Sequence, residues 1–321
     1  MTNKIAIIGA GISGLTLATT LQEKGIDAQV FDKGRGVGGR MSSRRTDWGY
    51  IDHGTQYFSL SNNQLKEFIK IYGDVLKPWQ GKFASWENGV FEKDDSPKIK
   101  YVPDKAMNNL CKFLGGDITV KLKTRICSIV KVDDSWTLRD EQNHCYGDFD
   151  GVIITAPPYQ TANLLPDDCL FKAEIAQIKM FPCFSLMVIP ETKINLPFTG
   201  VKFKHPILGW ISDNDTKPHR GDGGAIVIQS NFTYAMAHLG DDREAIAGEL
   251  LRATEQVLNV RFSSFKYYSL HLWRYALPQQ SSDKGYFYDP QTGLGVCGDW
   301  CLSGKVEGAF LSARAIALKI N

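Results

Sequence analysis

The stretch KIAIIGAGISG, residues 4–14, decides the fold of this 321-residue chain. An apolar run precedes the glycines, and the apolar spacing typical of a helix follows them as far as Gly25. A second apolar run, DAQVF at 27–31, leads directly to Asp32. This order predicts a strand, a tight turn, a helix and a second strand, which together make one parallel βαβ unit.

The spacing of the three glycines in this turn is typical of a site for a dinucleotide. Gly9 allows the tight turn, Gly11 lets the backbone approach a pyrophosphate, and Gly14 permits close packing of the helix on the sheet. The helix N-terminus offers unpaired N–H groups to the phosphates, and a carboxylate at Asp32 would accept hydrogen bonds from ribose hydroxyls. We expect dinucleotide contacts from Gly9, Gly11, Ile12, Ser13, Gly14, Asp32 and Lys33.

A second glycine-rich segment, GRGVGGRMS, covers residues 34–42. Its glycines suit close backbone approach to a dinucleotide, and its arginines suit the charge of the phosphates. The alternative is a flexible basic loop. The residues expected to line the path of the cofactor are Gly38, Gly39, Arg40 and Met41.

A third segment lies near the end of the chain, where Gly298-Asp299-Trp300 follows a predicted strand and a last helix covers 306–320. The N-terminus of a helix can stabilise negative charge on a ligand, and Asp299 can bind a hydroxyl group. The alternative is an ordinary C-terminal capping helix. The candidate residues in this segment are Asp299, Glu307, Gly308 and Ala309.

Composition narrows the classes of protein that the chain can belong to. Lys and Arg exceed Asp and Glu by only two charges, which argues against a dedicated nucleic-acid-binding protein. No uninterrupted apolar segment of about 18 residues occurs, so we expect no membrane span. The seven cysteines are dispersed with no CxxC pair, which favours free thiols in the cytoplasm and no metal site.

The quoted segments resemble the FAD-binding parts of the flavin amine oxidase superfamily, as do GVIITAPP at 151–158 and GDWCLSGKVEGAFLSARAIA at 298–317. More narrowly, DHGTQYF at 52–58 and HLWRYALP at 271–278 look like the renalase-type NAD(P)/FAD-dependent oxidoreductases of bacteria. The segments span the whole chain in the expected order.

The resemblance implies an α/β fold, in which a Rossmann-type FAD-binding domain of parallel sheet and helices carries an interleaved α+β substrate domain on a mixed or antiparallel sheet. Strands of the nucleotide-binding sheet are expected near the start, near 151 and near the end of the chain. We therefore expect the FAD-binding domain at 1–60, 104–160 and 290–321, and the substrate domain at 61–103 and 161–289.

The resemblance also implies the cofactor and the reaction. FAD would be bound non-covalently, with the backbone around Ile126 against the adenine, although Cys301 leaves covalent attachment open. Renalase-type enzymes pass hydride from the 2- and 6-dihydro isomers of NAD(P) to flavin N5, giving NAD(P)+, and dioxygen then gives hydrogen peroxide. A dihydropyridine loses hydride without prior deprotonation, which agrees with a sequence that has no evident nucleophile and base, and no catalytic residue is assigned.

Several aromatic and polar residues are candidates for the substrate side. Tyr57 and Trp273 could stack on a nicotinamide ring, Gln56 could orient its carboxamide, and Arg274 could meet a phosphate. The alternative for each is a core or salt-bridged side chain. The full set is His53, Gln56, Tyr57, Trp210, His271, Trp273 and Arg274.

Three functions are open at this stage. The first is the FAD-dependent oxidase of dihydronicotinamide isomers, with the small-molecule substrate and dioxygen as its partners. The second is a flavin amine oxidase or another FAD-dependent oxidoreductase of a small molecule. The third is a non-catalytic dinucleotide-binding redox sensor. We expect a monomer or a homodimer, with neither nucleic acid nor membrane as a partner.

Overall fold

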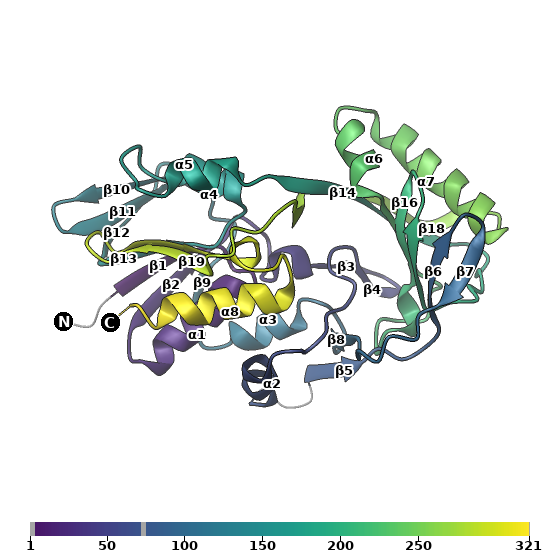
Figure 1. Cartoon of the computed structure of the whole chain (residues 1–321), viewed down its shortest axis with the longest axis horizontal. Coiled ribbons are helices and arrows are strands. Elements are labelled where there is room, and N and C mark those ends of the chain that lie inside the picture. The colour runs from purple at the N-terminus through teal and green to yellow at the C-terminus, as the bar shows by residue number, and fades with distance from the viewer. Residues whose placement is uncertain (1–3, 72–74, 321) are drawn as a thin grey trace.

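The structure is a computed structural model that describes residues 4–71 and 75–320. Figure 1 shows an elongated molecule with two lobes, and the long strand β14 (Met180–Pro190) reaches from the first lobe into the second. The first lobe holds both β1 (Lys4–Ile8) and α8 (Val306–Ala317), which come from opposite ends of the described chain.

A six-stranded sheet forms the centre of the first lobe. Strand β1 is almost entirely apolar and buried, and it lies between two parallel neighbours, which is the position that a continuous apolar run favours. Helix α1 (Ile12–Glu23) connects β1 to β2 and packs against α8. The strand order is β19 (Tyr286–Asp289), β20 (Leu294–Cys297), β13 (Gly151–Ile154), β1, β2 (Asp27–Phe31) and β9 (Thr119–Lys121).

Smaller elements cover the two faces of this sheet. A three-stranded antiparallel sheet of β10 (Ile126–Val132), β11 (Ser135–Asp140) and β12 (Cys145–Phe149) lies on one face with the short helices α4 (Pro158–Leu164) and α5 (Lys172–Gln177), and a turn at 133–134 joins β10 to β11. The other face is covered by helices. These helices are α1, α8, α2 (Asn63–Lys70) and α3 (Asn109–Leu114).

A seven-stranded mixed sheet forms the second lobe. Its long strands β14 and β18 (Phe265–Pro278) pair over most of their length, and helices α6 (Phe232–Ala237) and α7 (Arg243–Leu258) cover one face. The strand order is β18, β14, β17 (Ile226–Ser230), β16 (Leu208–Asp213), β15 (Gly200–Lys204), β6 (Phe83–Glu87) and β7 (Val90–Lys93).

The predicted α/β fold class is therefore confirmed, and several details differ from the sequence prediction. The segment that follows the glycine-rich stretch 34–42 forms a hairpin of β3 (Ser43–Thr46) and β4 (Gly49–Asp52), which the sequence pattern did not predict. Strand β19 pairs with β20 in the first lobe, although it precedes the predicted domain boundary at 290. Helix α2 packs its Phe68 ring 4.9 Å from that of Phe310, so it belongs to the core of the first lobe.

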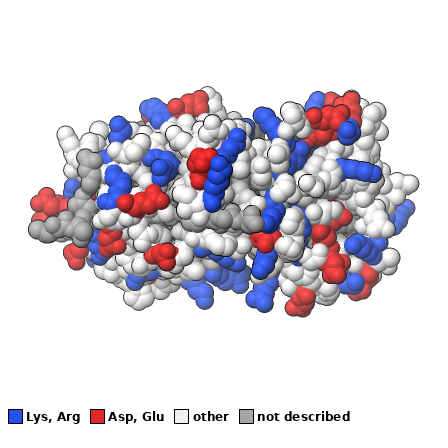
Figure 2. Space-filling model, turned by 90° about the horizontal axis from the view of Figure 1, so that it is seen from below, with Lys and Arg blue, Asp and Glu red and all other residues white. Residues whose placement is uncertain are grey.

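Surface charge is mixed in sign. Figure 2 shows Lys and Arg interspersed with Asp and Glu over the face that it displays. None of the helices in the described part of the chain has both the length and the apolar character needed to cross a bilayer.

Candidate active site

The glycine turn after β1 forms a cradle with one open position. A Cβ atom on Gly9 would lie 2.4 Å from Thr155 Oγ1, and one on Gly14 would lie 1.9 Å from the carbonyl oxygen of Gly9. A Cβ atom on Gly11 would meet nothing within 4 Å. Gly9 and Gly14 are thus needed for packing, whereas Gly11 faces space that a pyrophosphate could occupy.

Helix α1 starts without a side-chain cap. Its N-cap residue is Gly11, and no side chain accepts a hydrogen bond from the first N–H groups of the helix. The side chains of Ile12 and Ser13 are buried, and Ser13 Oγ lies 3.3 Å from Cys297 Sγ. These two residues can therefore offer their backbone N–H groups to an anion, but not their side chains.

Asp32 connects the turn to the segment that follows β2. Its Oδ2 accepts a hydrogen bond from Ala10 N at 2.7 Å, and its Oδ1 accepts one from Gly34 N at 2.6 Å. An ionised carboxylate has about four acceptor positions. Asp32 therefore keeps the capacity to bind ribose hydroxyls. Lys33 beside it donates to Gln160 Oε1 at 3.1 Å, and burial lowers the pKa of its amine.

The segment between β9 and β10 lies against Asp32. Thr124 N donates to the carbonyl oxygen of Asp32 at 2.9 Å, and Lys123 N donates to that of Gly34 at the same distance. Ile126 follows two residues later and is buried. The predicted adenine-side segment thus lies next to the predicted ribose ligand.

The glycine-rich segment 34–42 folds over the turn. Gly38 N donates to the carbonyl oxygen of Ala10 at 2.8 Å, and a Cβ atom on Gly39 would lie 3.6 Å from the Cα atom of Gly11. Met41 is buried in the core of the first lobe. The close approach of the two glycine segments explains why both are rich in glycine.

Arg40 and Asp299 join the early and late segments of the chain. The guanidinium donates to both carboxylate oxygens, with Nη1–Oδ2 at 2.9 Å and Nη2–Oδ1 at 2.6 Å. Nη1 also lies 3.3 Å from the carbonyl oxygen of Ala276 in β18. This bidentate pair brings together two residues that the sequence analysis assigned separately to the cofactor path.

The start of α8 contains the other three C-terminal candidates. Glu307 Oε2 accepts from Ser61 N at 2.8 Å and Asn62 N at 2.9 Å, so its carboxylate holds the segment before α2. A Cβ atom on Gly308 would lie 2.4 Å from Ser303 Oγ, and Ala309 is buried. Contact with a flavin at this helix would therefore involve the backbone.

Cys301 does not favour covalent attachment of a cofactor. Its side chain is buried, and burial raises the pKa of its thiol well above the usual value. A thiol held protonated is a poor nucleophile. All seven cysteines are free, as the sequence indicated.

The segment 52–57 lies against the face of the second-lobe sheet that the α6 and α7 helices leave open. Four residues form one row across this sheet, because Trp210 pairs with Gln229, Gln229 with Ser185, and Ser185 with His271. Neighbours in such a row share a face. Three of the substrate-side candidates, Trp210, His271 and Trp273, are therefore on this face together.

His53 packs on two of these residues. Its ring centroid lies 4.9 Å from that of His271 and 5.3 Å from that of Trp273. Burial, with the nearby His271 and Arg44, lowers the pKa of His53 to about 3. His53 is therefore neutral at physiological pH. Burial also lowers the pKa of His271.

Gln56 is fully engaged within the protein. Its Oε1 accepts from Ser212 Oγ at 3.0 Å and from Lys217 Nζ at 3.1 Å, and its Nε2 donates to the carbonyl oxygens of Asp52 and Gly54 at 2.6 and 3.1 Å. The suggestion that Gln56 orients a carboxamide of the substrate is therefore not supported, since the amide has its partners already.

An aromatic cluster surrounds Tyr57. Its ring centroid lies 5.6 Å from that of Trp210, 6.1 Å from Trp79 and 6.5 Å from Phe83. Tyr57, Phe83 and Trp210 keep part of their surface exposed. Trp79 and Phe83 cannot be recognised as site residues from the sequence, because alternation in 83–87 predicts a strand but does not identify what each face of it contacts.

Arg274 does not share the face of Trp273. Successive residues of a strand point to opposite faces, and Leu272, two residues from Arg274, packs in the core beneath α7. Arg274 is exposed. It is therefore separated from the sheet face that carries His271 and Trp273.

A buried ionic cluster lies beneath this site, and no local sequence signal identifies it. Asp52 Oδ2 accepts from Lys217 Nζ at 3.1 Å and from Arg220 Nε at 3.0 Å, and all three side chains are fully buried. Although burial alone would raise the pKa of Asp52, the charges of Lys217 and Arg220 hold it below its usual value. Burial lowers the pKa of Lys217 to about 8.

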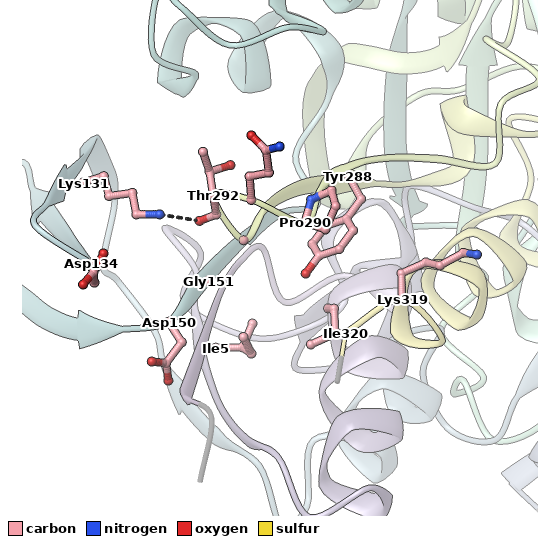
Figure 3. Close-up of a pocket in the computed structure, with 12 residues that line it drawn as sticks. Ile5, Lys131, Asp134, Asp150, Gly151, Tyr288, Pro290, Thr292, Lys319 and Ile320 are labelled. Carbon is pink, nitrogen blue, oxygen red and sulfur yellow. Dashed lines mark hydrogen bonds between the residues drawn. The ribbon is translucent and has the colours of Figure 1, made fainter. Parts of the chain in front are cut away.

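A pocket of about 380 Å³ lies away from all of these residues. Figure 3 shows it at the N-terminal ends of β1 and β13, beside Ile5 and Gly151, with Lys131 donating to the carbonyl oxygen of Thr292. The glycine turn follows the opposite, C-terminal end of β1. Ligands of open α/β sheets bind at the C-terminal ends of the strands, so this pocket is not the cofactor site.

Comparison with known proteins identifies the family. Residues 100–321 match the flavin containing amine oxidoreductase family, and residues 7–72 match the NAD(P)-binding Rossmann-like domain. The human flavin-containing monooxygenase 1 is 25% identical over 195 residues, which cover 54% of this chain and 32% of the relative. A 4,4'-diapophytoene desaturase of Staphylococcus aureus (strain MRSA252) is 41% identical over 95 residues, which cover 29% of this chain and 18% of the relative. The chain thus spans about a third or less of these relatives.

Solved structures share the fold over their whole length. A putrescine oxidase bound to putrescine has a TM-score of 0.74 at 14% identity, with 100% of this chain and 99% of that chain covered. A fatty acid isomerase from P. acnes has a TM-score of 0.75 at 10% identity, with 99% and 98% covered. The chain belongs to the flavin containing amine oxidoreductase family, which implies FAD as its cofactor.

Proposed function

We propose that the protein is an FAD-dependent oxidase of the 2- and 6-dihydro isomers of NAD(P). Bound FAD supplies a two-electron acceptor, so that one hydride leaves the dihydropyridine to give NAD(P)+, and dioxygen takes up the two electrons with two protons to give hydrogen peroxide. The resemblance of residues 52–58 and 271–278 to renalase-type enzymes motivates this choice within the family.

The observation that carries the proposal is the aromatic surface around 52–57, where the polar side chains of Gln56 and Lys217 are already paired within the protein. Gln56 has partners at both ends of its amide, Lys217 is paired with Asp52, and His53 has a pKa of about 3. The face thus offers aromatic surface beside the weakly basic, neutral imidazoles of His53 and His271. A dihydropyridine needs stacking and orientation, and it loses hydride without a base.

Each side of the site has a proposed role. We propose that Tyr57 and Trp273 flank the nicotinamide ring, while Arg274, on the opposite face of β18, takes no part in binding this substrate. On the cofactor side, the open position at Gly11 and the uncapped start of α1 support pyrophosphate binding. The residues proposed to hold FAD non-covalently are Gly9, Gly11, Ile12, Ser13, Gly14, Asp32, Lys33, Gly38, Gly39, Arg40, Met41, Ile126, Asp299, Glu307, Gly308 and Ala309.

A second candidate is the oxidation of an amine, which the family match favours. An aromatic cluster such as that around Tyr57 can also receive an ammonium group. The two functions differ in their need for a base, because an ammonium substrate must lose a proton before it can give up hydride.

Turnover in air separates the two candidates. The purified holoprotein is mixed with borohydride-generated dihydro-NAD isomers, or with a panel of primary and secondary amines, and oxygen uptake is recorded. The proposal expects NAD+ and hydrogen peroxide in equal amounts from the isomers, and no uptake with the amines. Turnover of an amine alone would replace the proposed function with the second candidate.

The seven free cysteines are consistent with a protein that functions in the reducing environment of the cytoplasm, which is the location we propose. Cell fractionation that recovers the protein outside the cytoplasm would contradict this location.

A further inference from the structure

The backbone carbonyl groups of residues 52–54 all accept hydrogen bonds from side chains. Asp52 O accepts from Gln56 Nε2 at 2.6 Å, His53 O accepts from Trp273 Nε1 at 2.8 Å, and Gly54 O accepts from Gln229 Nε2 at 2.8 Å. Gln229 Nε2 also lies 3.5 Å from His53 O. The carbonyl edge of this segment is thus fixed by three side chains, two of which come from the second-lobe sheet.

The opposite edge of the segment faces the first lobe. Thr55 N donates to the carbonyl oxygen of Arg40 at 2.9 Å, and a Cβ atom on Gly54 would lie only 2.0 Å from that oxygen. The side chain of Arg40 in turn binds Asp299. The segment is therefore held between the substrate-side sheet and two residues that we propose contact FAD.

The two glutamines are well placed to keep this arrangement rigid. Gln229 lies on β17, which is paired on both sides by β14 and β16, so its backbone cannot shift without disrupting the sheet. Gln56 is buried, and Ser212 and Lys217 fix its oxygen so that its nitrogen must face the carbonyl groups. Rotation of the peptide groups at 53–55 would leave the buried donor of Gln56 and the half-buried donor of Gln229 unpaired.

We infer that Gln56 and Gln229 are positioning residues, which hold the backbone of 53–55 against Arg40 and so fix the surface on which the reacting ring rests. The inference rests on the family's FAD cofactor. Of the measurements that test it, only the reduction of the flavin by dihydro-NAD isomers depends on the proposed substrate. Within the described residues the side-chain oxygen of Gln229 accepts no hydrogen bond, so its amide binds the backbone through its nitrogen alone.

Gln229→Leu is the test variant, because it keeps the volume of the side chain and removes the donor. Gln56→Leu is unsuitable alone, since it would also leave Lys217 with one fewer partner inside the protein. Ser185→Ala is the matched control, as Ser185 is the cross-strand neighbour of Gln229 and its hydroxyl has no hydrogen-bond partner. Far-ultraviolet circular dichroism and thermal melting verify that the wild type, Gln229→Leu and Ser185→Ala are all folded.

The readouts are the absorption band shape of the bound flavin, its midpoint potential, the affinity for FAD, and anaerobic reduction by dihydro-NAD isomers. We expect Gln229→Leu to keep FAD while both its band shape and its potential change, and Ser185→Ala to match the wild type. The limiting rate of reduction should fall about 10- to 100-fold, with a smaller change in the concentration for half-maximal rate.

Two results would overturn the inference. One is a flavin spectrum and potential in Gln229→Leu that equal those of Ser185→Ala, and the other is loss of FAD or of the fold, which would make Gln229 a general structural residue. If the isomers do not reduce the wild-type flavin, the proposed function fails, while the spectrum and the potential still decide the role of Gln229.

Discussion

Gly11 and Gly14 belong to one motif, but the structure gives them different physical tasks. We expect Gly14→Ala to destabilise the protein by about 1–3 kcal/mol, because its Cβ atom would overlap the carbonyl oxygen of Gly9. Gly11→Ala should change the free energy of unfolding by less than about 0.5 kcal/mol, since its Cβ atom meets open space. Urea denaturation of the two apoproteins measures this difference.

The same pair should separate stability from cofactor binding. Gly11→Ala should weaken FAD binding about tenfold, which is about 1.4 kcal/mol, because the methyl group occupies the proposed place of the pyrophosphate. Titration of the apoprotein with FAD, followed by quenching of flavin fluorescence, gives the affinity. An unchanged affinity would remove Gly11 from the proposed cofactor site.

His53 should make the protein sensitive to acid. Its pKa is about 3 in the folded protein and near 6.5 in the unfolded chain, so between these values the unfolded state binds the extra proton. The contribution of His53 is thus intact above pH 6.5 and is lost as the pH falls, by about 1.4 kcal/mol per pH unit. Between pH 7 and pH 4.5 the free energy of unfolding, taken from denaturation curves at each pH, should fall less steeply with decreasing pH for His53→Gln than for the wild type. Equal pH dependence in the two proteins would contradict the assigned pKa.

At the scale of elements, the short helical turns η1 (Gly39–Met41) and η4 (Asp299–Cys301) meet through Arg40 and Asp299. Asp299→Asn should lower FAD affinity about tenfold or more, because the guanidinium loses its bidentate partner and with it a fixed position. The thermal melting temperature of the apoprotein should change little, as the Arg40 side chain is partly exposed. Equal FAD affinity in the variant and the wild type would show that the pair does not serve the cofactor.

The elements also show what the sequence could predict. The strand, turn and helix at 4–23 follow from local pattern, since their apolar periodicity and glycine spacing lie within one short stretch. The hairpin at 43–52 was missed, because half of its residues are charged or glycine, and the groups that hold it in place, at Asn214 and Arg220, lie far along the chain. Gln229 and Trp79 give no local signal, as their roles depend on cross-strand and interlobe contacts.

At the scale of the whole molecule, the buried ionic cluster of Asp52, Lys217 and Arg220 connects the β3–β4 hairpin to the second lobe. Asp52→Asn would leave the buried charges of Lys217 and Arg220 without their counter-ion, so we expect a loss of about 3–5 kcal/mol in the free energy of unfolding. The exposed pair of Lys204 and Glu87 is the control, and Glu87→Gln should cost less than about 1 kcal/mol. Comparable losses in the two variants would refute the importance of the buried cluster.

The two lobes contribute different parts of the proposed enzyme. The first lobe supplies the glycine cradle and Asp32, and the second supplies the aromatic and amide side chains that contact 52–57. The order of the motifs predicted this division in outline, but not that Gln56 is engaged within the protein or that Arg274 points away from Trp273. Both outcomes depend on side-chain direction, which period-two alternation and distant partners determine.

The most direct measurement of the proposed function is a single anaerobic turnover of the holoprotein with a stoichiometric amount of dihydro-NAD isomer. The flavin absorption near ~450 nm, a property of the cofactor, is recorded together with NAD+ formed. The proposed oxidase should lose this absorption completely and form one NAD+ for each flavin, with no reaction from an amine under the same conditions. A flavin that stays oxidised with both isomers while an amine bleaches it would contradict the proposed function.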